Sequence, residues 1–591
     1  MHLEHRVAII GGGLAGLRAA IAVHDRGVKD VAIISQLPPV RSHSVAAAGG
    51  INGSLANHPN GKDDSWERHM FDTVKGSDFL ADQDAAEVMA REAVPRIIEM
   101  EHWGCPFSRN EDGTIAQRPF GGAGFPRTAF AADKTGHALL HTMYQQTLKR
   151  GIKVYSEVQV LELAVEDGRV VGAVIIDILS GTVGTVKADA FLFATGGAGK
   201  IYAHSTNNLL NTGLGMAVAF HAGVPLKDME FIQFHPTGLW GTNILMTEGC
   251  RGEGAILRNV NGERFMERYA PTLKDLAPRD FVSRCMDQEI KEGRGCGPQK
   301  DYIHLDMTHL GGETILKRLP SVFEIGHNFA NVDITKEPIP VVPTIHYQMG
   351  GIPTNIHGQV VVPNGGDPNA VVGGLYAVGE CSCVSVHGAN RLGTNSLLDL
   401  LVFGRAAGNH IVDAFKRADR AHKPLPQDAA DLTLSRLARL DASSSGEYAQ
   451  DVANDLRATM QQHAGVFSTQ ASMDEGVVKV AALRERVEAI TLKDKSQVFN
   501  TARVEALEVE NLIESAQATM VSAAARRECR GAHTVKDYER GPDDAESPLG
   551  RNDREWMKHT LWYAEGSRLE YKPVQMKPLT VESVPPKVRT F

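Results

Sequence analysis

Three features of common protein classes are missing from this 591-residue sequence. No run approaches the roughly 20 apolar residues of a membrane-spanning helix, although the chain could still dock on a membrane-bound partner. Basic residues are not clustered and the net charge is −9, which disfavours a nucleic-acid surface. The first predicted strand begins at about Arg6, so we expect no signal or transit segment before it.

Cysteine is scarce, odd in number and scattered. Of the seven cysteines, only Cys381 and Cys383 stand close together, which suits a reducing compartment better than a disulfide framework. No four cysteines have the spacing of an iron–sulfur cluster, and no Cys-x-x-Cys-His motif offers haem attachment. The sequence therefore predicts no metal site.

The N-terminal residues carry the pattern of a dinucleotide-binding unit. The turn reads Gly11-x-Gly13-x-x-Gly16, in which the glycines make a tight turn, let the backbone approach a pyrophosphate and let a helix pack on a strand. A surface glycine-rich turn is the alternative, but correctly placed elements flank the motif. These are a buried strand, a helix and a second strand, predicted over Val7–Ile10, Leu14–His24 and Val31–Ile34.

The acidic residue expected at the end of the second strand is missing. Ser35 and Gln36 stand there instead. Because a carboxylate at this point binds the ribose of NAD, its absence argues against simple NAD use. A covalently fixed cofactor would tolerate the weaker grip on its ribose.

A histidine follows this motif within the Gly/Ala-rich segment Arg41–Gly50. The triplet Ser42-His43-Ser44 beside Gly49-Gly50 predicts a flavin bonded to His43. An imidazole nitrogen is a competent nucleophile toward the activated ring methyl of a flavin, and the resulting bond raises the flavin's reduction potential. An ordinary loop histidine is the alternative.

The length is too great for one hydrophobic core, and the order of elements predicts an α/β fold with four parts. Strands at Ala190–Ala194 and Gly373–Glu380, a β hairpin at Val154–Leu163 and Arg169–Asp177, and a helix at Asn395–Phe415 belong to the nucleotide-binding sheet. We expect a Rossmann-like FAD-binding domain (1–226 and 341–415), an inserted α+β capping domain (227–340), a helical bundle (416–525) and a small, irregular C-terminal domain (526–591).

Nine motifs in a fixed order make the chain resemble the flavoprotein subunit family of succinate dehydrogenase and fumarate reductase. Each motif alone is weak, but their order through nearly the whole chain is specific. They are Arg41–Gly50, Arg127–His141, Phe234–Gly238, Thr247–Gly254, Ala277–Asp280, His346–Gly351, Asn390–Gly393, Asn395–Leu398 and Arg530–His533.

The resemblance implies covalent FAD on His43. It also implies flavin contacts at Glu380, Ser396 and Leu397. Together with the residues of the glycine turn and the histidine segment, the expected cofactor-binding set is Gly11, Gly13, Gly16, Ser35, His43, Ser44, Gly49, Gly50, Glu380, Ser396 and Leu397.

The implied reaction interconverts succinate and fumarate, so the site must hold two carboxylates. The planar fork of Arg391 suits bidentate binding of one carboxylate, which His346 can also contact. The resemblance places His235 and Thr247 on the other carboxylate. His235 could instead be a satisfied core histidine.

The resemblance further implies that Arg279 gives or takes the proton. Glu248 and Arg251 are three residues apart and can face each other on a turn, connecting Arg279 to solvent. In the alternative interpretation, Arg279 pairs with Asp280 on the surface. Cys250 is either a reactive thiol near the substrate or a small buried residue.

Three positions depart from the family pattern. Ala48 replaces a polar residue common beside the Gly-Gly pair, and it leaves the preferred direction of the reaction open. Leu214 replaces an acidic residue that would meet the cofactor, so we expect no flavin contact there. Thr394 stands where a smaller residue is commoner.

Electrons must leave the flavin, and the chain has no cluster of its own. The resemblance implies a hetero-oligomer with an iron–sulfur subunit and a membrane anchor that exchanges electrons with quinone. We expect it on the cytoplasmic face of a prokaryotic inner membrane, with a weak preference for succinate oxidation. The rival interpretations are an L-aspartate oxidase-like flavoenzyme, which would lack the flavin-linking histidine, and a non-catalytic flavin electron-relay subunit.

Overall fold

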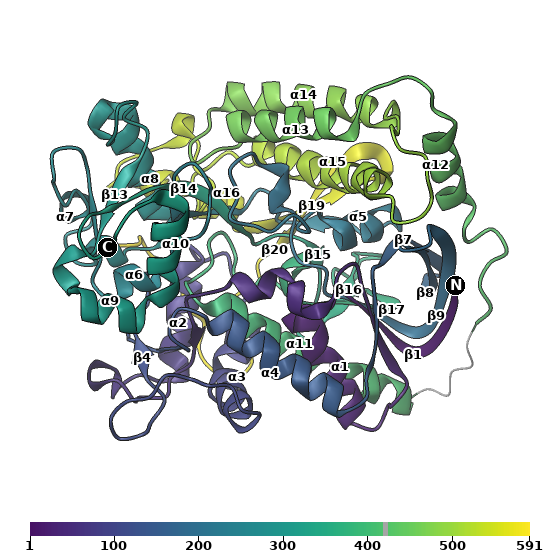
Figure 1. Cartoon of the computed structure of the whole chain (residues 1–591), viewed down its shortest axis with the longest axis horizontal. Helices are drawn as coiled ribbons and strands as arrows, with labels where there is room; N and C mark the ends of the chain where they lie inside the picture. The colour runs from purple at the N-terminus through teal and green to yellow at the C-terminus, as the bar shows by residue number, and fades with distance from the viewer. Residues whose placement is uncertain (418–422, 591) are drawn as a thin grey trace.

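A computed structural model describes residues 1–417 and 423–590. Its largest sheet follows the order β16-β17-β8-β9-β1-β2-β6, with β7 paired to β8 (Figure 1). The strands are β1 (His2–Ile10), β2 (Val31–Ser35), β6 (Lys153–Ser156), β7 (Val158–Glu166), β8 (Arg169–Asp177), β9 (Thr182–Phe193), β16 (Gln359–Val361) and β17 (Val371–Ala377).

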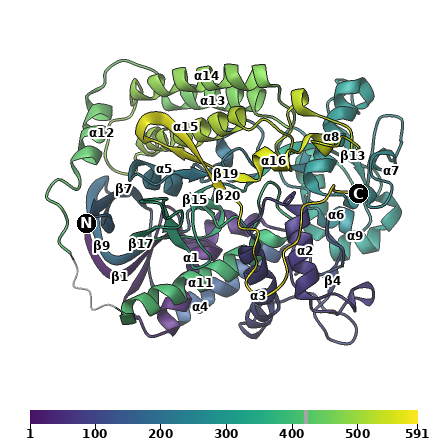
Figure 2. The same cartoon turned by 180° about the vertical axis from the view of Figure 1, so that it is seen from behind.

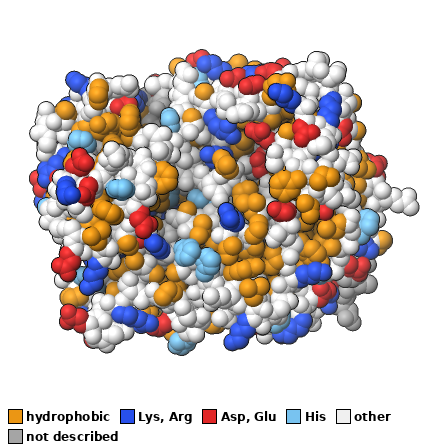
Figure 3. Space-filling view, viewed as in Figure 1, with side chains coloured by type: hydrophobic (Ala, Val, Ile, Leu, Met, Phe, Trp, Pro, Cys, Tyr) orange, Lys and Arg blue, Asp and Glu red, His pale blue; other side chains and the backbone are white. Residues whose placement is uncertain are grey.

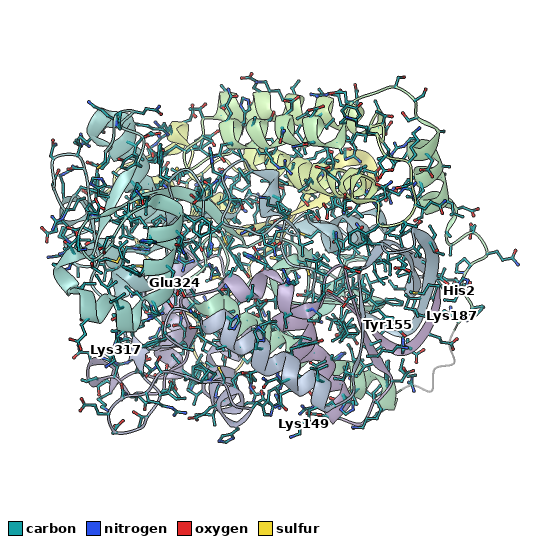
Figure 4. The ribbon with its side chains drawn as sticks, in the orientation of Figure 1. His2, Lys149, Tyr155, Lys187, Lys317 and Glu324 are labelled. Carbon is teal, nitrogen blue, oxygen red and sulfur yellow. The ribbon has the colours of Figure 1, made fainter. Side chains whose placement is uncertain are left out.

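Strand β1 runs parallel to both of its neighbours, β2 and β9. Figure 4 shows the labelled His2 and Lys187 at the same edge of the sheet, where β1 and β9 begin to pair. The predicted hairpin over 154–163 is wrong in one respect. Its first residues form β6, which is parallel to β2, and only β7 forms an antiparallel pair with β8.

The sheet separates two hydrophobic cores. Val7 and Ile9 of β1 belong to one core, and Ala8 and Ile10 belong to the other. Because both faces of the sheet are covered, the strand reads as a continuous apolar run instead of alternating. The first core contains helices α1 (Leu14–Asp25), α3 (Gln83–His102), α4 (Thr135–Lys149) and α11 (Asn395–Arg417).

The second core joins the sheet to the C-terminal helices. Helix α5 (Leu214–His221) and the helical layer above it in Figure 1 share this core with β7 and β8. The predicted helical region is therefore packed against the FAD-binding sheet. It comprises α12 (Asp431–Ala442), α13 (Ala449–His463), α14 (Gln470–Glu488) and α15 (Thr501–Ala525).

A second sheet and its helices form a cap. The antiparallel order is β11-β14-β13-β12, from strands β11 (Ile232–Leu239), β12 (Ile256–Arg258), β13 (Ile303–Asp306) and β14 (Ile339–Gln348). Its helices are α6 (Gly249–Gly252), α7 (Met266–Tyr269), α8 (Arg279–Glu289), α9 (Gly312–Arg318) and α10 (Pro320–Ala330). The predicted boundary at 340 falls inside β14, and the one at 226 falls inside β10 (Leu226–Lys227).

The C-terminal segment is more regular than expected. After α16 (Asp553–Trp556), strands β19 (Lys558–Tyr563) and β20 (Arg568–Pro573) complete a three-stranded sheet with β10. Figure 2 shows the chain then running back past α2 (Trp66–Gly76) and α3 to end beside the cap. This return ties the tail to the FAD-binding domain and to the cap.

The surface in view carries both signs of charge. In Figure 3, Lys and Arg are interspersed with Asp and Glu, and apolar side chains gather in the lower half of the face. Within residues 1–417 and 423–590, none of the helices combines the length and the apolar character needed to cross a membrane.

Candidate active site

One cavity lies where the glycine turn, the histidine segment and the cap meet. Every predicted substrate residue lines it, and so do most of the predicted cofactor residues. The predicted residues on its wall are Gly11, Gly13, His43, Ser44, Gly49, Gly50, His235, Thr247, Glu248, Arg279, His346, Glu380, Arg391, Ser396 and Leu397. Gly16, Ser35 and Arg251 stand behind this wall.

The glycine turn forms the phosphate end of the cavity. Gly11 has a φ of +116°, and a Cβ there would approach Ala194 O to 2.1 Å. A Cβ on Gly16 would lie 2.0 Å from Gly11 O, so this glycine lets α1 pack against the turn. Gly13 precedes α1, and the first N–H of that helix, on Leu14, donates to Ser44 Oγ at 3.3 Å. The turn thus presents a helix N-terminus to the cavity, as a pyrophosphate requires.

His43 opens a short helical turn over His43–Ala46 on the wall of the same cavity. Its Nδ1 is buried and has no hydrogen-bond partner in the described part of the chain. Burial lowers the pKa of His43 to about 4, so its imidazole is neutral at pH 7. Gly136 of α4 packs so closely on this turn that a Cβ would lie 2.2 Å from Ser44 O. His43 is therefore a neutral imidazole on the wall of the cavity, in a turn that Gly136 packs against.

Glu380 follows β17 and also lines the cavity. Its Oε1 accepts from the backbone N–H of Gln348 at 3.1 Å. Burial raises the pKa of Glu380 to about 7. Ser396 and Leu397 lie in the first turn of α11 and line the same space.

Two buried guanidinium groups converge at the cap end of the cavity. Arg279 is the first residue of α8, and Arg391 precedes α11. Gln233 Oε1 accepts from both, at 3.3 Å from Arg279 Nη1 and 3.0 Å from Arg391 Nη2. The Gln233 amide in turn donates to Asn390 Oδ1 and to Arg391 O. Sequence reasoning missed Gln233, although it lies two residues before His235, the spacing that places strand residues on one face.

His235 and His346 pack edge to face beside these arginines. Their ring centroids are 5.0 Å apart. Burial, and then the Arg279 charge, lowers the pKa of each imidazole well below its usual value. His346 Nδ1 lies 2.8 Å from Thr206 Oγ1, and His235 Nε2 is buried without a partner among the described residues. A satisfied core histidine is thus a poor description of His235.

Glu248 joins Arg279 to Arg251. Its Oε2 accepts from Arg279 Nε and lies 3.7 Å from Arg251 Nη2, while its Oε1 accepts from Gly121 N at 2.6 Å. Burial opposes ionisation of Glu248, but the two arginines outweigh it and lower its pKa. Burial lowers the pKa of Arg251, and burial with the Arg279 charge lowers that of Arg391 to about 9.

The substrate end therefore carries an excess of positive charge. Arg251 and Arg279 share the Glu248 carboxylate, and among the described residues Arg391 forms no ion pair, although the charges of Glu380 and Glu248 act on it. Such an arrangement fits a ligand with two negative charges, which would also desolvate the site. Thr247 lines the same end and its hydroxyl accepts from Gly249 N at 3.1 Å.

The surface alternative for Arg279 does not hold. Asp280 accepts from Arg589 at 2.7 Å and from Arg284 at 3.3 Å, whereas Arg279 donates to Glu248, and both Arg279 and Asp280 are buried. Cys250 is fully buried, and burial raises its pKa to about 12, so it is a packed thiol. Leu214 and Thr394 are also buried, and of these two only Thr394 lines the cavity.

The residues present fit FAD. The backbone at Gly11 and Gly13 is open to a pyrophosphate, and the buried orphan nitrogens of His43, His235 and Arg391 all face one cavity. Within the described residues, no three His, Cys, Asp or Glu side chains come together as a metal site. All seven cysteines are buried free thiols.

Fold and cavity together define an FAD-dependent oxidoreductase with a cationic substrate site. Residues 6–397 match the FAD binding domain family, and residues 453–591 match the family described as fumarate reductase flavoprotein C-term. The chain belongs to the family of flavoprotein subunits of succinate dehydrogenase and fumarate reductase.

Full-length relatives support that assignment. The chain is 48% identical to the succinate dehydrogenase flavoprotein subunit of Rickettsia bellii, over 100% of this chain and 99% of the relative. It is 40% identical to the fumarate reductase flavoprotein subunit of Mycobacterium tuberculosis, over 100% of both. A solved E. coli quinol fumarate reductase chain matches with a TM-score of 0.89 and 39% identity, over 99% of each. These relatives favour the main interpretation over the L-aspartate oxidase and relay alternatives.

Proposed function

We propose that this flavoprotein subunit holds FAD covalently through His43 and exchanges a hydride between its flavin and a four-carbon dicarboxylate. When bound, FAD supplies the acceptor or donor of the hydride. The neutral imidazole of His43, held by the packing of Gly136 against its turn, supports the covalent bond. Gly11, Gly13 and the N-terminus of α1 would hold the phosphates.

The two ends of the substrate would bind to different side chains. Arg391 and His346 would hold one carboxylate, and His235 and Thr247 the other. Gln233 supports this assignment as a positioning residue, because its single amide oxygen fixes the spacing of Arg279 and Arg391. Cap and FAD-binding domain together would exclude water from the reacting carbons.

Proton transfer would run through Arg279, Glu248 and Arg251. The ion pair between Arg279 and Glu248 gives the Arg279 guanidinium a proton acceptor at its Nε. Glu248 lies between the two arginines, so in succinate oxidation Arg279 can pass its Nε proton to Glu248 as it takes a proton from the substrate, and in fumarate reduction the same path through Glu248 and Arg251 runs in reverse. This chain of contacts is the physical reason for assigning acid–base work to an arginine.

The electrons would pass to partner subunits. Because the described residues bring together no metal-ligating cluster, we propose an iron–sulfur subunit as the acceptor and a membrane anchor that exchanges electrons with quinone. The protein would then be peripheral on the cytoplasmic face of a prokaryotic inner membrane. We favour succinate oxidation as the direction.

The observation that carries this proposal is the convergence of Arg279 and Arg391 on one cavity with His43. Trichloroacetic acid precipitation should leave yellow fluorescence with the wild-type protein and release it from His43→Ser. A malonate titration should shift the flavin spectrum of both proteins. Free flavin after precipitation of the wild type would contradict the covalent link, and an unchanged spectrum would contradict the dicarboxylate site.

The His43 bond also has a kinetic signature. His43→Ser should keep FAD by its phosphates but lower succinate oxidation more than fumarate reduction, because the lost bond lowers the flavin potential. Steady-state rates in both directions, on flavin-saturated protein, check this. Equal loss in both directions would contradict the potential-raising role.

A further inference from the structure

The end of β2 is the one place where the dinucleotide fingerprint is incomplete. The position 20 residues after Gly16 normally carries the carboxylate that binds the ribose 2′-hydroxyl. Gln36 occupies it here, directly after Ser35, the last residue of β2. Ser35 itself packs on the glycine turn, since a Cβ on Gly12 would lie 3.0 Å from its Oγ.

A carboxylate nevertheless reaches this position from a distant part of the chain. Gln36 Nε2 donates to Glu508 Oε1 at 2.7 Å. Glu508 lies on α15, which packs against the sheet through α5 and the second core. The fold therefore returns an acidic group to the strand end at which the sequence lacks one.

Glu508 differs from other carboxylates of the same helix. Glu510 accepts from Arg436 and Arg439, and Glu514 accepts from Arg484. Within residues 1–417 and 423–590, no Lys, Arg or His lies within ion-pair distance of Glu508, although the Arg457 charge acts on it from farther away. Burial raises the pKa of Glu508 to about 7, against the hydrogen bond from Gln36. A half-buried carboxylate without a direct ion pair is costly to the fold, so a purely structural role explains it poorly.

We propose that Glu508, oriented by Gln36, binds the 2′-hydroxyl of the FAD adenosine ribose. The carboxylate accepts one hydrogen bond from Gln36 and has lone pairs left for the hydroxyl. The neutral side chain of Gln36 suits the position at the end of β2, because a carboxylate there would be repelled by the Glu508 carboxylate. This inference rests on FAD binding alone and does not need the His43 bond.

Reversible FAD binding to the full-length chain tests the proposal. The His43→Ser background permits titration of the apo-protein by flavin fluorescence quenching. Glu508→Gln should weaken FAD about tenfold, the loss of one charge-assisted hydrogen bond. FAD made with 2′-deoxyadenosine should bind both proteins equally, because the hydroxyl in question is absent.

The matched control is Glu505→Gln, one turn earlier on α15, which should leave the affinity for FAD within about twofold. Equal weakening of FAD and of its 2′-deoxy analogue by Glu508→Gln would overturn the proposal, and so would no weakening. If the wild type proves to hold FAD without a covalent bond, the same titrations apply to it directly. Failure of the covalent link and failure of this inference are thus separate results.

Discussion

Two sets of buried arginines differ in how their charge is matched. The tail cluster (Arg526, Arg530, Arg551 and Arg589) joins the C-terminal segment to the rest of the molecule. Each of its guanidinium groups lies within 3.0 Å of a carboxylate, with Glu230, Glu528, Asp78 and Asp280 as partners. In the active-site cluster (Arg251, Arg279 and Arg391), Arg251 and Arg279 share Glu248, and Arg391 forms no ion pair with a carboxylate of the described residues.

The difference appears in the basicity of the side chains. In the tail cluster, carboxylates outweigh burial and raise the pKa of Arg526, Arg530 and Arg589. In the active-site cluster, burial prevails and lowers the pKa of Arg251 and Arg391. Buried arginines that are paired with carboxylates help to hold the fold together. A buried arginine without such a partner costs free energy of folding, and the binding of a dianionic ligand offsets that cost.

The largest expected effect is on turnover. Arg279→Leu should keep the flavin and the dicarboxylate but lower kcat at least about 10³-fold, because it removes the proposed proton-transfer group that donates to Glu248. Steady-state kinetics and a malonate titration check this. Near-normal turnover would remove the assigned role of Arg279.

A substitution in the tail cluster should lower the stability of the protein instead of its turnover. Arg530→Leu removes the buried cation that Glu528 and Asp553 share, while Glu528 keeps Arg526 and Asp553 keeps Arg551, so the cost should be about 3 kcal/mol, the low end for breaking a buried ion pair. Thermal unfolding of the holo-protein measures the loss. The turnover of the remaining folded protein should be unchanged, and a fall in kcat without a fall in Tm would break the contrast between the clusters.

Glu248→Gln tests the difference between the two arginine clusters from the side of the active site. It removes the carboxylate that Arg251 and Arg279 share, so turnover should fall about 10²-fold while dicarboxylate binding is unchanged or tighter. Kinetics and malonate affinity are read on the same preparation. Weaker malonate binding would show that Glu248 holds the arginines in place instead of relaying protons.

The smallest expected effect is on the pH dependence of stability. The folded pKa of His346 lies below its unfolded value, so the unfolded chain binds more protons and stability falls as the pH drops below about 6.5. His346→Gln should reduce that slope by up to about 1.4 kcal/mol per pH unit.

The tail cluster gives the control for this measurement. The surrounding arginines outweigh the burial of Asp78 and lower its pKa. The stability that ionised Asp78 contributes to the fold is therefore fully present above a pH of about 4, and it is lost only as the pH falls further. Arg530→Leu should therefore lower Tm by the same amount at pH 5 and pH 7. A slope unchanged by His346→Gln would contradict the neutral state of that histidine.

Local patterns predicted much of this molecule. The glycine turn was predictable because its close backbone approaches tolerate only glycine, as at Gly11 and Gly16. The motif order predicted His235, Thr247, His346 and Arg391 as substrate residues, and the structure brings all four onto one cavity. The domain boundaries remain predictions. Strand β14 (Ile339–Gln348) crosses the predicted boundary at residue 340 between the capping domain and the FAD-binding domain.

Contacts between distant residues were not predictable. Gln233 bridges Arg279 and Arg391 through its amide oxygen, and nothing in its own segment specifies either partner. Glu508 stands 472 residues from Gln36, with which it shares a hydrogen bond. Such pairings depend on how separate elements pack, and single-chain periodicity carries no information about them.

The central claim is that unmatched cationic charge recognises a dianion. Flavin absorbance titrations of the holo-protein with fumarate and with crotonate, which has one carboxylate fewer, test it most directly. The dicarboxylate should bind at least about 100-fold more tightly, the worth of two charge-assisted hydrogen bonds. Equal affinity for the two acids would contradict the account.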